Sequence, residues 1–255
     1  MTDISISIVT HNSAKVIGCL LESLFTYAKS QSFQVYVVDN GSTDNTVSII
    51  KEQFPQVMLV EQENKGFGAG HNAILGSIDS KYHAIINPDI YFENDALDVL
   101  FTYMENHPEV AICNPQIHNP DGTRQLVPCI QPKYRYQLSR KLEKLGGIFR
   151  RWRDEYTMRN VAFVDPVDVG TCTGCFMFIR TELFKKLHGF DDRFFLYCED
   201  ADLSRRAQQY GKSVCVCPAV VVHGWERGSG HSLKLLRIHL SSMHKYKKKW
   251  RKEKV

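Results

Sequence analysis

The chain has 255 residues, of which 43% are hydrophobic and 24% are charged, and its formal net charge is +4. This composition is that of a folded globular protein, and the length suffices for one α/β core with a decorated second half. The first residues lack a basic leader, and no apolar run approaches the ~20 residues of a membrane-spanning helix. We therefore expect a cytoplasmic protein without a secretory signal, whose eight cysteines are reduced thiols.

Strand-like and helix-like segments alternate through the first half. Strands are expected at residues 4–10, 35–38, 57–60, 84–87 and 110–115, and helices at 16–28, 46–54, 69–77 and 94–106. Such alternation predicts a Rossmann-like, mostly parallel central sheet with helices on both faces. Ligands of such open sheets bind beyond the carboxyl ends of the strands, which here are the loops at 10–12, 39–44 and 87–89.

The second half is less regular. A turn signal at residues 119–122 predicts a hairpin, and Gly146 and Gly147 favour two pieces for a helix around residues 138–152. Further strands are expected at 164–169, 175–179, 213–217 and 219–223, and helices at 181–187, 200–211 and 233–250. Basic residues mixed with aromatics gather at 133–153 and 234–254, which predicts contact with a membrane surface or a nucleic acid.

Three carboxylates crowd the start of one expected helix. Glu199, Asp200 and Asp202 follow an aromatic run that contains Phe195 and Tyr197. The helix dipole alone favours one or two acidic residues there. Desolvation and mutual repulsion would raise the pKa of at least one of the three, as suits a general base. A capped, salt-bridged helix start is the equally open alternative.

Two further segments indicate a nucleotide site. Asp39 ends a buried strand, where its carboxylate would accept hydrogen bonds from a base N–H or a ribose hydroxyl, whereas residues 40–44 favour an ordinary Asx-turn. The glycine-rich segment at 64–72 would let backbone N–H groups approach a phosphate or sugar. Its glycine spacing and its distance from the first strand do not match the dinucleotide fingerprint, so hydride transfer is disfavoured.

Candidate metal ligands also lie at strand ends. Asp89 is suited to hold Mg²⁺ or Mn²⁺ on a diphosphate, although a strand-terminal Asp before a turn is common. His223 would complete that site, although a lone His is more often structural. Zinc on the pairs Cys172/Cys175 and Cys215/Cys217 is disfavoured, because the pairs are far apart and small thiols pack well in strands.

Taken in order, these segments resemble the family 2 inverting glycosyltransferases of the GT-A fold, and most of all the bacterial branch that uses dTDP-L-rhamnose. The matching segments are SIVTHN at 7–12, VVDNGSTDNT at 37–46, NKGFGAGHN at 64–72, IINPDI at 85–90, the stretch 168–211 and VVHGW at 221–225. The likeness covers almost the full length. Each motif is weak or moderate alone, but their order and spacing are highly specific.

The resemblance implies roles for particular residues. Thr10 and Asp39 would bind the base and ribose, and the donor side would also include Asn12, Gly41, Lys65, Gly66, Asn72 and Asn87. Asp89 would be the metal-binding end of a D-x-D-like element, with His223 as second ligand for Mn²⁺ or Mg²⁺. Asn87 stands where many relatives carry the first Asp, which implies modest metal affinity. Asp200 would be the catalytic base, and the acceptor side would include Gly174, Cys175, Glu199 and Trp225.

The resemblance also implies an organisation and partners. Residues 1–230 would form one GT-A domain, with 1–115 as the nucleotide-binding half and 116–230 as the acceptor and catalytic half, followed by a basic helix at 231–255. Family acceptors are often glycans or lipid-linked sugars at the inner membrane face. The basic helix, with Tyr246 and Trp250, is therefore expected on anionic lipids at about 1 kcal/mol per cation, unless it is a solvated tail.

Other functions stay open as alternatives. The donor is expected to be dTDP-rhamnose, or otherwise a UDP-sugar such as a UDP-hexose or UDP-galactofuranose. A nucleotidyltransferase would need a glycine- and basic-rich phosphate loop near the first strand, and residues 10–13 do not form one. A nucleic-acid-binding protein is disfavoured, because no recognised motif is present and the basic segments lie at the edges.

Overall fold

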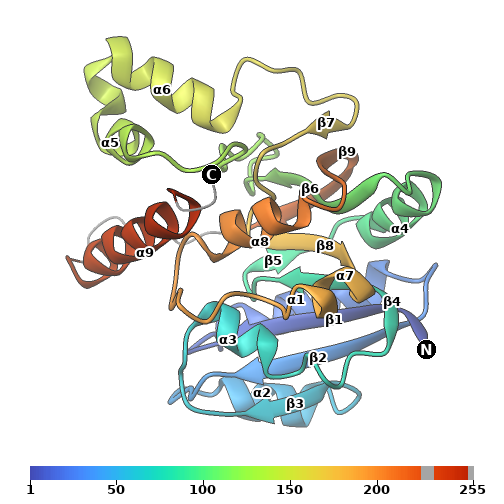
Figure 1. Cartoon of the computed structure of the whole chain (residues 1–255). Coiled ribbons are helices and arrows are strands. Elements are labelled where there is room, and N and C mark those ends of the chain that lie inside the picture. Colours follow the sequence, from blue (N-terminus) through green and yellow to red (C-terminus); the bar gives the residue numbers. More distant parts are fainter. Residues whose placement is uncertain (225–232, 252–255) are drawn as a thin grey trace.

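A nine-stranded mixed sheet runs through the computed structural model, which describes residues 1–224 and 233–251 (Figure 1). The strands are β1 (Thr2–Thr10), β2 (Phe33–Asp39), β3 (Met58–Glu61), β4 (Ser80–Ile86), β5 (Ile90–Tyr91), β6 (Val110–His118), β7 (Val167–Asp168), β8 (Phe176–Arg180) and β9 (Lys212–His223). Their order is β3-β2-β1-β4-β8-β6-β9-β5, with β7 paired to β9. The predicted parallel core is confirmed in β3-β2-β1-β4 and in β6–β9, while β5, β7 and β8 pair antiparallel with their neighbours.

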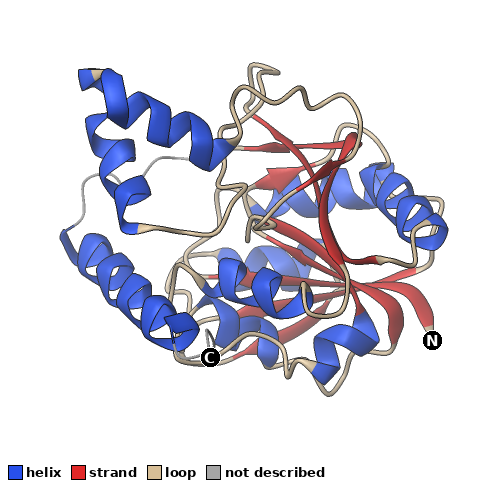
Figure 2. Cartoon of the chain, turned by 45° about the horizontal axis from the view of Figure 1, so that its top comes forward, coloured by secondary structure: helices blue, strands red, loops and turns tan. Residues whose placement is uncertain are grey.

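Helices cover both faces of this sheet, as Figure 2 shows. They are α1 (Ile17–Tyr27), α2 (Thr46–Gln53), α3 (Phe67–Asn72), α4 (Ala96–Asn106), α5 (Tyr134–Leu142), α6 (Gly147–Thr157), α7 (Thr181–Lys186), α8 (Glu199–Ala207) and α9 (Leu233–Arg251), and a short 3₁₀ turn spans Glu143–Leu145. Within the described residues, no helix combines the length and the apolar character that crossing a membrane requires.

Two hydrophobic cores lie on opposite faces of the sheet, because successive strand side chains point to opposite sides. Along β4, Ala84 and Ile86 belong to the core under α1, α2 and α4, whereas Ile85 belongs to the core under α3, α7 and α8. Strand β8 alternates in the same way, with Phe178 in the first core and Met177 in the second. Both faces are therefore covered by packed apolar side chains, which leaves the strand ends as the place for a ligand.

Several boundaries differ from the expected ones. Helix α3 ends at Asn72, and β7 has two residues where 164–169 had been expected. The two strands expected at 213–223 are one strand, β9, whose register against β6 shifts next to Pro218. That proline has no N–H to donate, so the ladder is interrupted without ending the strand. The turn at 119–122 is followed only by an isolated bridge between His118 and Arg124.

The C-terminal helix packs on the body of the protein. Met243, Tyr246 and Trp250 form a small core with residues of α8 and the preceding loop, and Tyr246 and Trp250 are 1% and 6% exposed. These two rings are therefore buried within the protein, and contact of the basic helix with lipid stays a prediction that concerns its other side chains. Burial of the apolar stripe of α9 against α8 places its other, cation-rich face outward.

Candidate active site

Two pockets open where the central strands end. The strand-end pocket, about 430 Å³, is lined by the residues that follow β1 and β4 together with the loops at 64–67 and 195–196. The helix-start pocket, about 290 Å³, surrounds the first turn of α8. Phe67, Asn87 and Leu196 line both, so the two pockets adjoin.

The strand-end pocket contains many of the expected donor residues: Thr10, Asn12, Gly66, Asn87 and Asp89. Asp39 lies behind its wall and is 2% exposed. Its carboxylate accepts from Thr10 Oγ1 at 2.8 Å, from Ser42 N at 2.8 Å and from Ser42 Oγ at 2.5 Å. Asp39 thereby fixes Thr10 and the loop that carries Gly41, which has a φ of 72°.

The loop after β2 is also tied to the loop after β1. Asn12 has a φ of 56°, and its Oδ1 accepts from Thr43 N at 2.8 Å. Asp44 Oδ1 accepts from Thr46 N at 3.0 Å, and its Oδ2 accepts from Ala14 N at 3.1 Å. The Asx-turn interpretation of this segment is thus confirmed at Asp44, and the loop is held rigid beside the pocket.

The glycine-rich segment is needed for a contact between two parts of the chain. Gly66 has a φ of 104°, and a Cβ there would collide with the carbonyl oxygen of Phe195. Phe67 N donates to the same oxygen at 2.9 Å. The backbone amides of this segment were expected to bind a phosphate. One of them, that of Phe67, is already hydrogen-bonded within the protein. Lys65 is exposed next to this contact.

Asn72 has its amide engaged within the fold. Its Oδ1 accepts from Phe190 N at 2.8 Å, and its Nδ2 donates to Phe190 O at 2.8 Å and to Asp192 Oδ1 at 2.9 Å. The structure thus places Asn72 at the junction of α3 with the 189–192 segment, which leads into the aromatic run before α8.

Asp89 and His223 meet because β5 pairs antiparallel with β9, which sets Ile90 opposite His223. His223 Nε2 lies 3.2 Å from Asp89 Oδ1. His223 Nδ1 lies 2.7 Å from Gln125 Oε1, which can only accept, so Nδ1 carries a proton and Nε2 faces the carboxylate. Asp89 Oδ1 is buried and accepts no hydrogen bond from the described residues.

This pair fits a divalent cation. An imidazole lone pair and a carboxylate oxygen facing each other require a cation between them, either a proton on Nε2 or a metal ion. Nitrogen and oxygen ligands with open positions suit Mn²⁺ or Mg²⁺, whose remaining ligands would be diphosphate oxygens and water. Within residues 1–224 and 233–251, no cluster of three or more His, Cys, Asp or Glu side chains with metal-site geometry occurs.

The backbone is strained immediately before α8. Tyr197 and Cys198 have φ values of 72° and 68°, which cost non-glycine residues of order 1 kcal/mol or more each. This turn directs the first helical residues toward the pocket. Asp200 Oδ2 accepts from Gly174 N at 3.1 Å, and Oδ1 accepts from Ala201 N at 2.8 Å. A Cβ on Gly174 would lie 3.2 Å from Asp200 Cβ, so only glycine allows this approach without displacement.

The two adjacent carboxyls have different environments. Burial raises the pKa of Asp200, and the hydrogen bonds from the amides of Ala201 and Gly174 oppose that rise. Burial and the nearby charge of Asp200 raise the pKa of Glu199 well above its usual range. Glu199 Oε2 is buried with no hydrogen-bond partner among the described residues. Glu199 is therefore the carboxyl that retains a proton, and Asp200 is the one suited to accept one.

Asp202, the third carboxylate, has a structural role. It is fully buried and accepts from Arg206 Nε at 2.8 Å, Lys249 Nζ at 2.8 Å and Trp250 Nε1 at 2.9 Å. Arg206 follows Asp202 by four residues, so their contact is an i,i+4 ion pair on α8. Asp202 thereby fastens α9 to α8 and supports the helix that carries Asp200.

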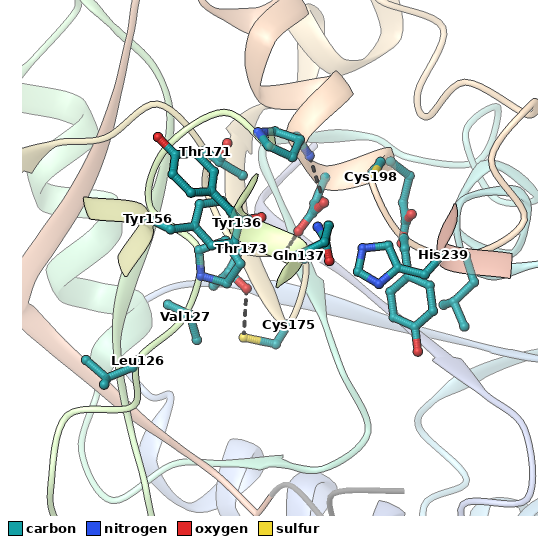
Figure 3. A pocket seen from close by; sticks show the side chains of 18 of the residues that line it. Leu126, Val127, Tyr136, Gln137, Tyr156, Thr171, Thr173, Cys175, Cys198 and His239 are labelled. Atoms are coloured by element: carbon teal, nitrogen blue, oxygen red, sulfur yellow. Dashed lines mark hydrogen bonds between the residues drawn. The ribbon is translucent and has the colours of Figure 1, made fainter. Parts of the chain in front are cut away.

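Sequence reasoning missed part of the helix-start pocket. His239 of α9 lines it and stacks on Tyr197 with ring centroids 4.7 Å apart. Tyr156 of α6 lines it beside Tyr136 of α5, and Figure 3 shows these two rings together and His239 apart from them. These residues lie in segments without motifs, so no sequence signal pointed to them.

The expected acceptor residues are mostly in this pocket. Gly174, Cys175 and Glu199 line it, and the hydroxyl of Thr173 lies 3.6 Å from Cys175 Sγ. Trp225 lies outside the described residues. The pocket thus combines a candidate base, a protonated carboxyl and aromatic walls, which is suited to hold a sugar and deprotonate one of its hydroxyls.

Comparison with known proteins gives a consistent result. The sequence profile described as Glycosyl transferase family 2 matches residues 5–188. An N-acetylglucosaminyl-diphospho-decaprenol L-rhamnosyltransferase of Mycobacterium tuberculosis is 27% identical over 268 residues, which cover 96% of this chain and 83% of the relative. The rhamnosyltransferase WbbL of Escherichia coli K12 is 25% identical over 250 residues, which cover 94% and 91%.

A solved structure supports the fold. The mannosyltransferase PcManGT from Pyrobaculum calidifontis, in complex with GDP-Man and Mn²⁺, superposes with a TM-score of 0.58 at 17% identity. The match covers 89% of this chain and 58% of that one, so the chain spans less than two thirds of that structure. At this identity the likeness shows a shared GT-A fold.

Proposed function

The chain belongs to glycosyltransferase family 2, and from that premise we propose that it transfers L-rhamnose from dTDP-L-rhamnose, with inversion, to a hydroxyl of a lipid-linked saccharide or polysaccharide precursor. The adjoining pockets carry this proposal. Asp89 lines the strand-end pocket and His223 lines the helix-start pocket, so this pair, suited to a diphosphate, lies where the two pockets adjoin. Asp200, suited to a base, lines the helix-start pocket. A donor and an acceptor placed in them would meet at the shared wall formed by Phe67, Asn87 and Leu196.

The donor would bind in the strand-end pocket. The nucleotide would contact the lining residues Thr10, Asn12, Gly66 and Asn87. Asp39 would act on the base or ribose through Thr10, or it would contact them directly after a local opening of the pocket wall. Further donor-side contacts are proposed for Gly41, Lys65 and Asn72. Residues 1–115 would thus form the nucleotide-binding half of a single domain spanning 1–230.

The proton transfer follows from the environment of Asp200. As the acceptor oxygen attacks the anomeric carbon, Asp200 takes the hydroxyl proton, and the bond from that carbon to the diphosphate breaks on the opposite side. The amides of Gly174 and Ala201 hold the carboxylate in place for this step. Glu199, which retains its proton, would donate a hydrogen bond to the acceptor sugar.

We further propose that Asp89 and His223 hold Mn²⁺ or Mg²⁺. A divalent ion would offset the negative charge that develops on the departing diphosphate. The choice of Mn²⁺ is supported by its presence in the PcManGT complex and by the imidazole ligand. Gln125 would orient His223 through Nδ1 and so act as a positioning residue.

The acceptor would be presented at a membrane. The mycobacterial relative is named for a diphospho-decaprenol acceptor, and α9 has exposed cations, among them Lys234, Arg237 and Lys248. We propose that this outer face contacts anionic lipid at the inner side of the cell membrane, with the inner face of α9 packed on α8. We do not propose a nucleic-acid partner.

Nucleotide-dependent thermal stability tests the donor. The protein would be heated with dTDP, UDP or GDP, each with and without Mn²⁺. A ligand at a hundred times its dissociation constant adds about 2.7 kcal/mol to stability. The expected result is the largest Mn²⁺-dependent shift with dTDP. A larger shift with UDP would favour a UDP-sugar, such as a UDP-hexose or UDP-galactofuranose, and no shift with any nucleotide would contradict the proposed function.

A further inference from the structure

A cation-lined groove lies between α9 and the segment that leads into α5, two elements that are neighbours in Figure 1. This α5–α9 groove has a volume of about 710 Å³. Its cationic lining residues are Lys133, Arg205, Lys247, Lys248 and Arg251. None of its lining residues is an Asp or Glu. The groove is therefore strongly positive and attracts anions.

Most of these cations have no counter-charge. Within the described residues, no carboxylate forms an ion pair with Lys133, Arg205, Lys248 or Arg251, in contrast to Lys249, which pairs with both Asp191 and Asp202. Like charges gathered in one groove repel one another, and an anionic ligand would remove that cost.

Aromatic rings lie against three of the charged groups, and the first is Lys133, whose Nζ lies 5.7 Å from the centroid of the Tyr136 ring. The Arg205 guanidinium lies 4.2 Å from the centroid of the Trp250 ring, and Lys247 Nζ lies 5.9 Å from that of Tyr134. Trp250 is anchored through Nε1 to the buried carboxylate of Asp202. This side of the groove is therefore held in a fixed geometry by α8 rather than formed by free surface side chains.

The groove adjoins the acceptor side of the active site. Pro132 lines both the groove and the helix-start pocket. Arg205 follows Asp200 by five residues on α8, which corresponds to about 7.5 Å along the helix. That separation is comparable to the length of one sugar ring together with its glycosidic phosphate. The groove is therefore within reach of a phosphate on the reducing end of a sugar bound at Asp200.

We propose that the α5–α9 groove binds the diphosphate that joins the acceptor sugar to its lipid, while a hydroxyl of that sugar lies at Asp200. This inference rests on the proposed function, and it specifies the place on the protein where the acceptor is bound. Tyr134 and Leu138 of α5 are 49% and 53% exposed, and they provide apolar surface for the first isoprene units beyond the diphosphate.

Binding of geranyl diphosphate to the full chain tests the proposal without knowledge of the sugar. Calorimetry would compare the wild type with a variant carrying Lys133→Gln, Lys248→Gln and Arg251→Gln. Arg205 is retained because of its contact with Trp250. We expect the dissociation constant to rise at least about tenfold, since three charged contacts are lost. Geraniol, which lacks phosphate, should bind both proteins equally weakly.

A charge-matched control variant carries Lys29→Gln, Lys186→Gln and Lys212→Gln, three exposed cations that do not line the groove and do not lie on α9. It should bind geranyl diphosphate as the wild type does. Equal weakening in both variants, or unchanged binding in the groove variant, would overturn the proposal. So would a groove variant that loses only binding to phosphatidylglycerol vesicles, because the groove would then serve a membrane headgroup.

A different measurement tests the proposed function itself. If no nucleotide stabilises the protein, the glycosyltransferase mechanism is contradicted whatever the groove binds. If the nucleotide shift is present and the groove variant binds geranyl diphosphate normally, only the acceptor inference is lost.

Discussion

Asp39 lies behind the wall of one pocket and Asp200 lines the other, and the surroundings of these two carboxylates differ. The carboxylate of Asp39 receives three hydrogen bonds from Thr10 and Ser42, and it ends an ordinary strand. The carboxylate of Asp200 receives two backbone hydrogen bonds, follows a strained turn and has the buried Glu199 beside it. A carboxylate that accepts several hydrogen bonds, such as that of Asp39, holds its neighbours in place. A carboxylate with fewer hydrogen bonds and a second carboxyl beside it, such as that of Asp200, has a raised pKa and is suited to take a proton.

The supports of the two sites differ as well. The strand-end site is held by strands that are adjacent in the parallel sheet, β1 and β2. The strained turn before α8 is held by packing against α9 and by the contacts of Asp202 with Lys249 and Trp250. The proposed base thus depends on a helix that is remote in sequence, whereas the β1–β2 side of the proposed nucleotide site is held by neighbouring strands.

The largest effect is expected for Asp200→Asn. Removing the base should lower kcat by about 10³-fold, within the range for general base catalysis, while nucleotide affinity stays near that of the wild type. Initial-rate kinetics and calorimetry measure the two quantities. Asp39→Asn is the matched comparison, for which we expect weaker donor binding and a kcat within tenfold. Full activity of Asp200→Asn would show that the base is elsewhere.

Asp202→Ala should affect stability most. The substitution removes the buried carboxylate that pairs with the partly buried cations Arg206 and Lys249, and breaking such a pair typically costs about 3–5 kcal/mol of unfolding free energy. Urea unfolding measures the change. Trp250→Phe, which removes one hydrogen bond to the same carboxylate, should cost about 1 kcal/mol. A loss below 1 kcal/mol for Asp202→Ala would mean that α9 does not support α8.

Asp89→Ala should weaken donor binding in the presence of Mn²⁺ by about 10–100-fold and leave binding without metal nearly unchanged. Gln125→Leu should have a smaller effect in the same direction, because it alters only the partner of His223 Nδ1. Nucleotide titrations with and without Mn²⁺ check both variants. An unchanged response to Mn²⁺ in Asp89→Ala would remove this residue from the site.

The smallest effect concerns acid stability. Burial lowers the pKa of His83 to about 3, and it lowers that of His71 well below its usual value. Because the unfolded chain binds more protons below about pH 6.5, stability is lost as the pH falls, by about 2 kcal/mol at pH 5 for His83 alone. Glu199 opposes this trend, since its raised pKa makes the folded state bind a proton that the unfolded chain releases.

A variant separates these contributions. His83→Gln should reduce the slope of the unfolding free energy against pH between pH 5 and 6. The reduction should correspond to about one bound proton relative to the wild type. Urea unfolding at several pH values measures both slopes. Identical slopes would show that His83 is protonated in the folded protein, in conflict with its burial between Ser5 and Ser7.

The sequence by itself determined the central sheet, its two covered faces and the family. Alternating apolar residues specify which side of a strand is buried, and polar residues such as Thr10 and Asp89 mark where a strand ends. The break at Gly146 and Gly147 also followed from the residue types, and both have positive φ. Such features depend on neighbours within a few positions, and residue types report them directly.

Only the tertiary structure decided which distant groups meet. The β5–β9 pairing brings Asp89 to His223, the close approach of Phe195 explains Gly66, and the docking of α9 brings His239 into the helix-start pocket. Periodicity predicted the helix at 233–250 but gave no information on which surface it covers. Long-range contacts depend on how whole helices and strands pack. The free energy gained by burying the apolar face of a helix is obtained only when a matching surface elsewhere in the fold covers it.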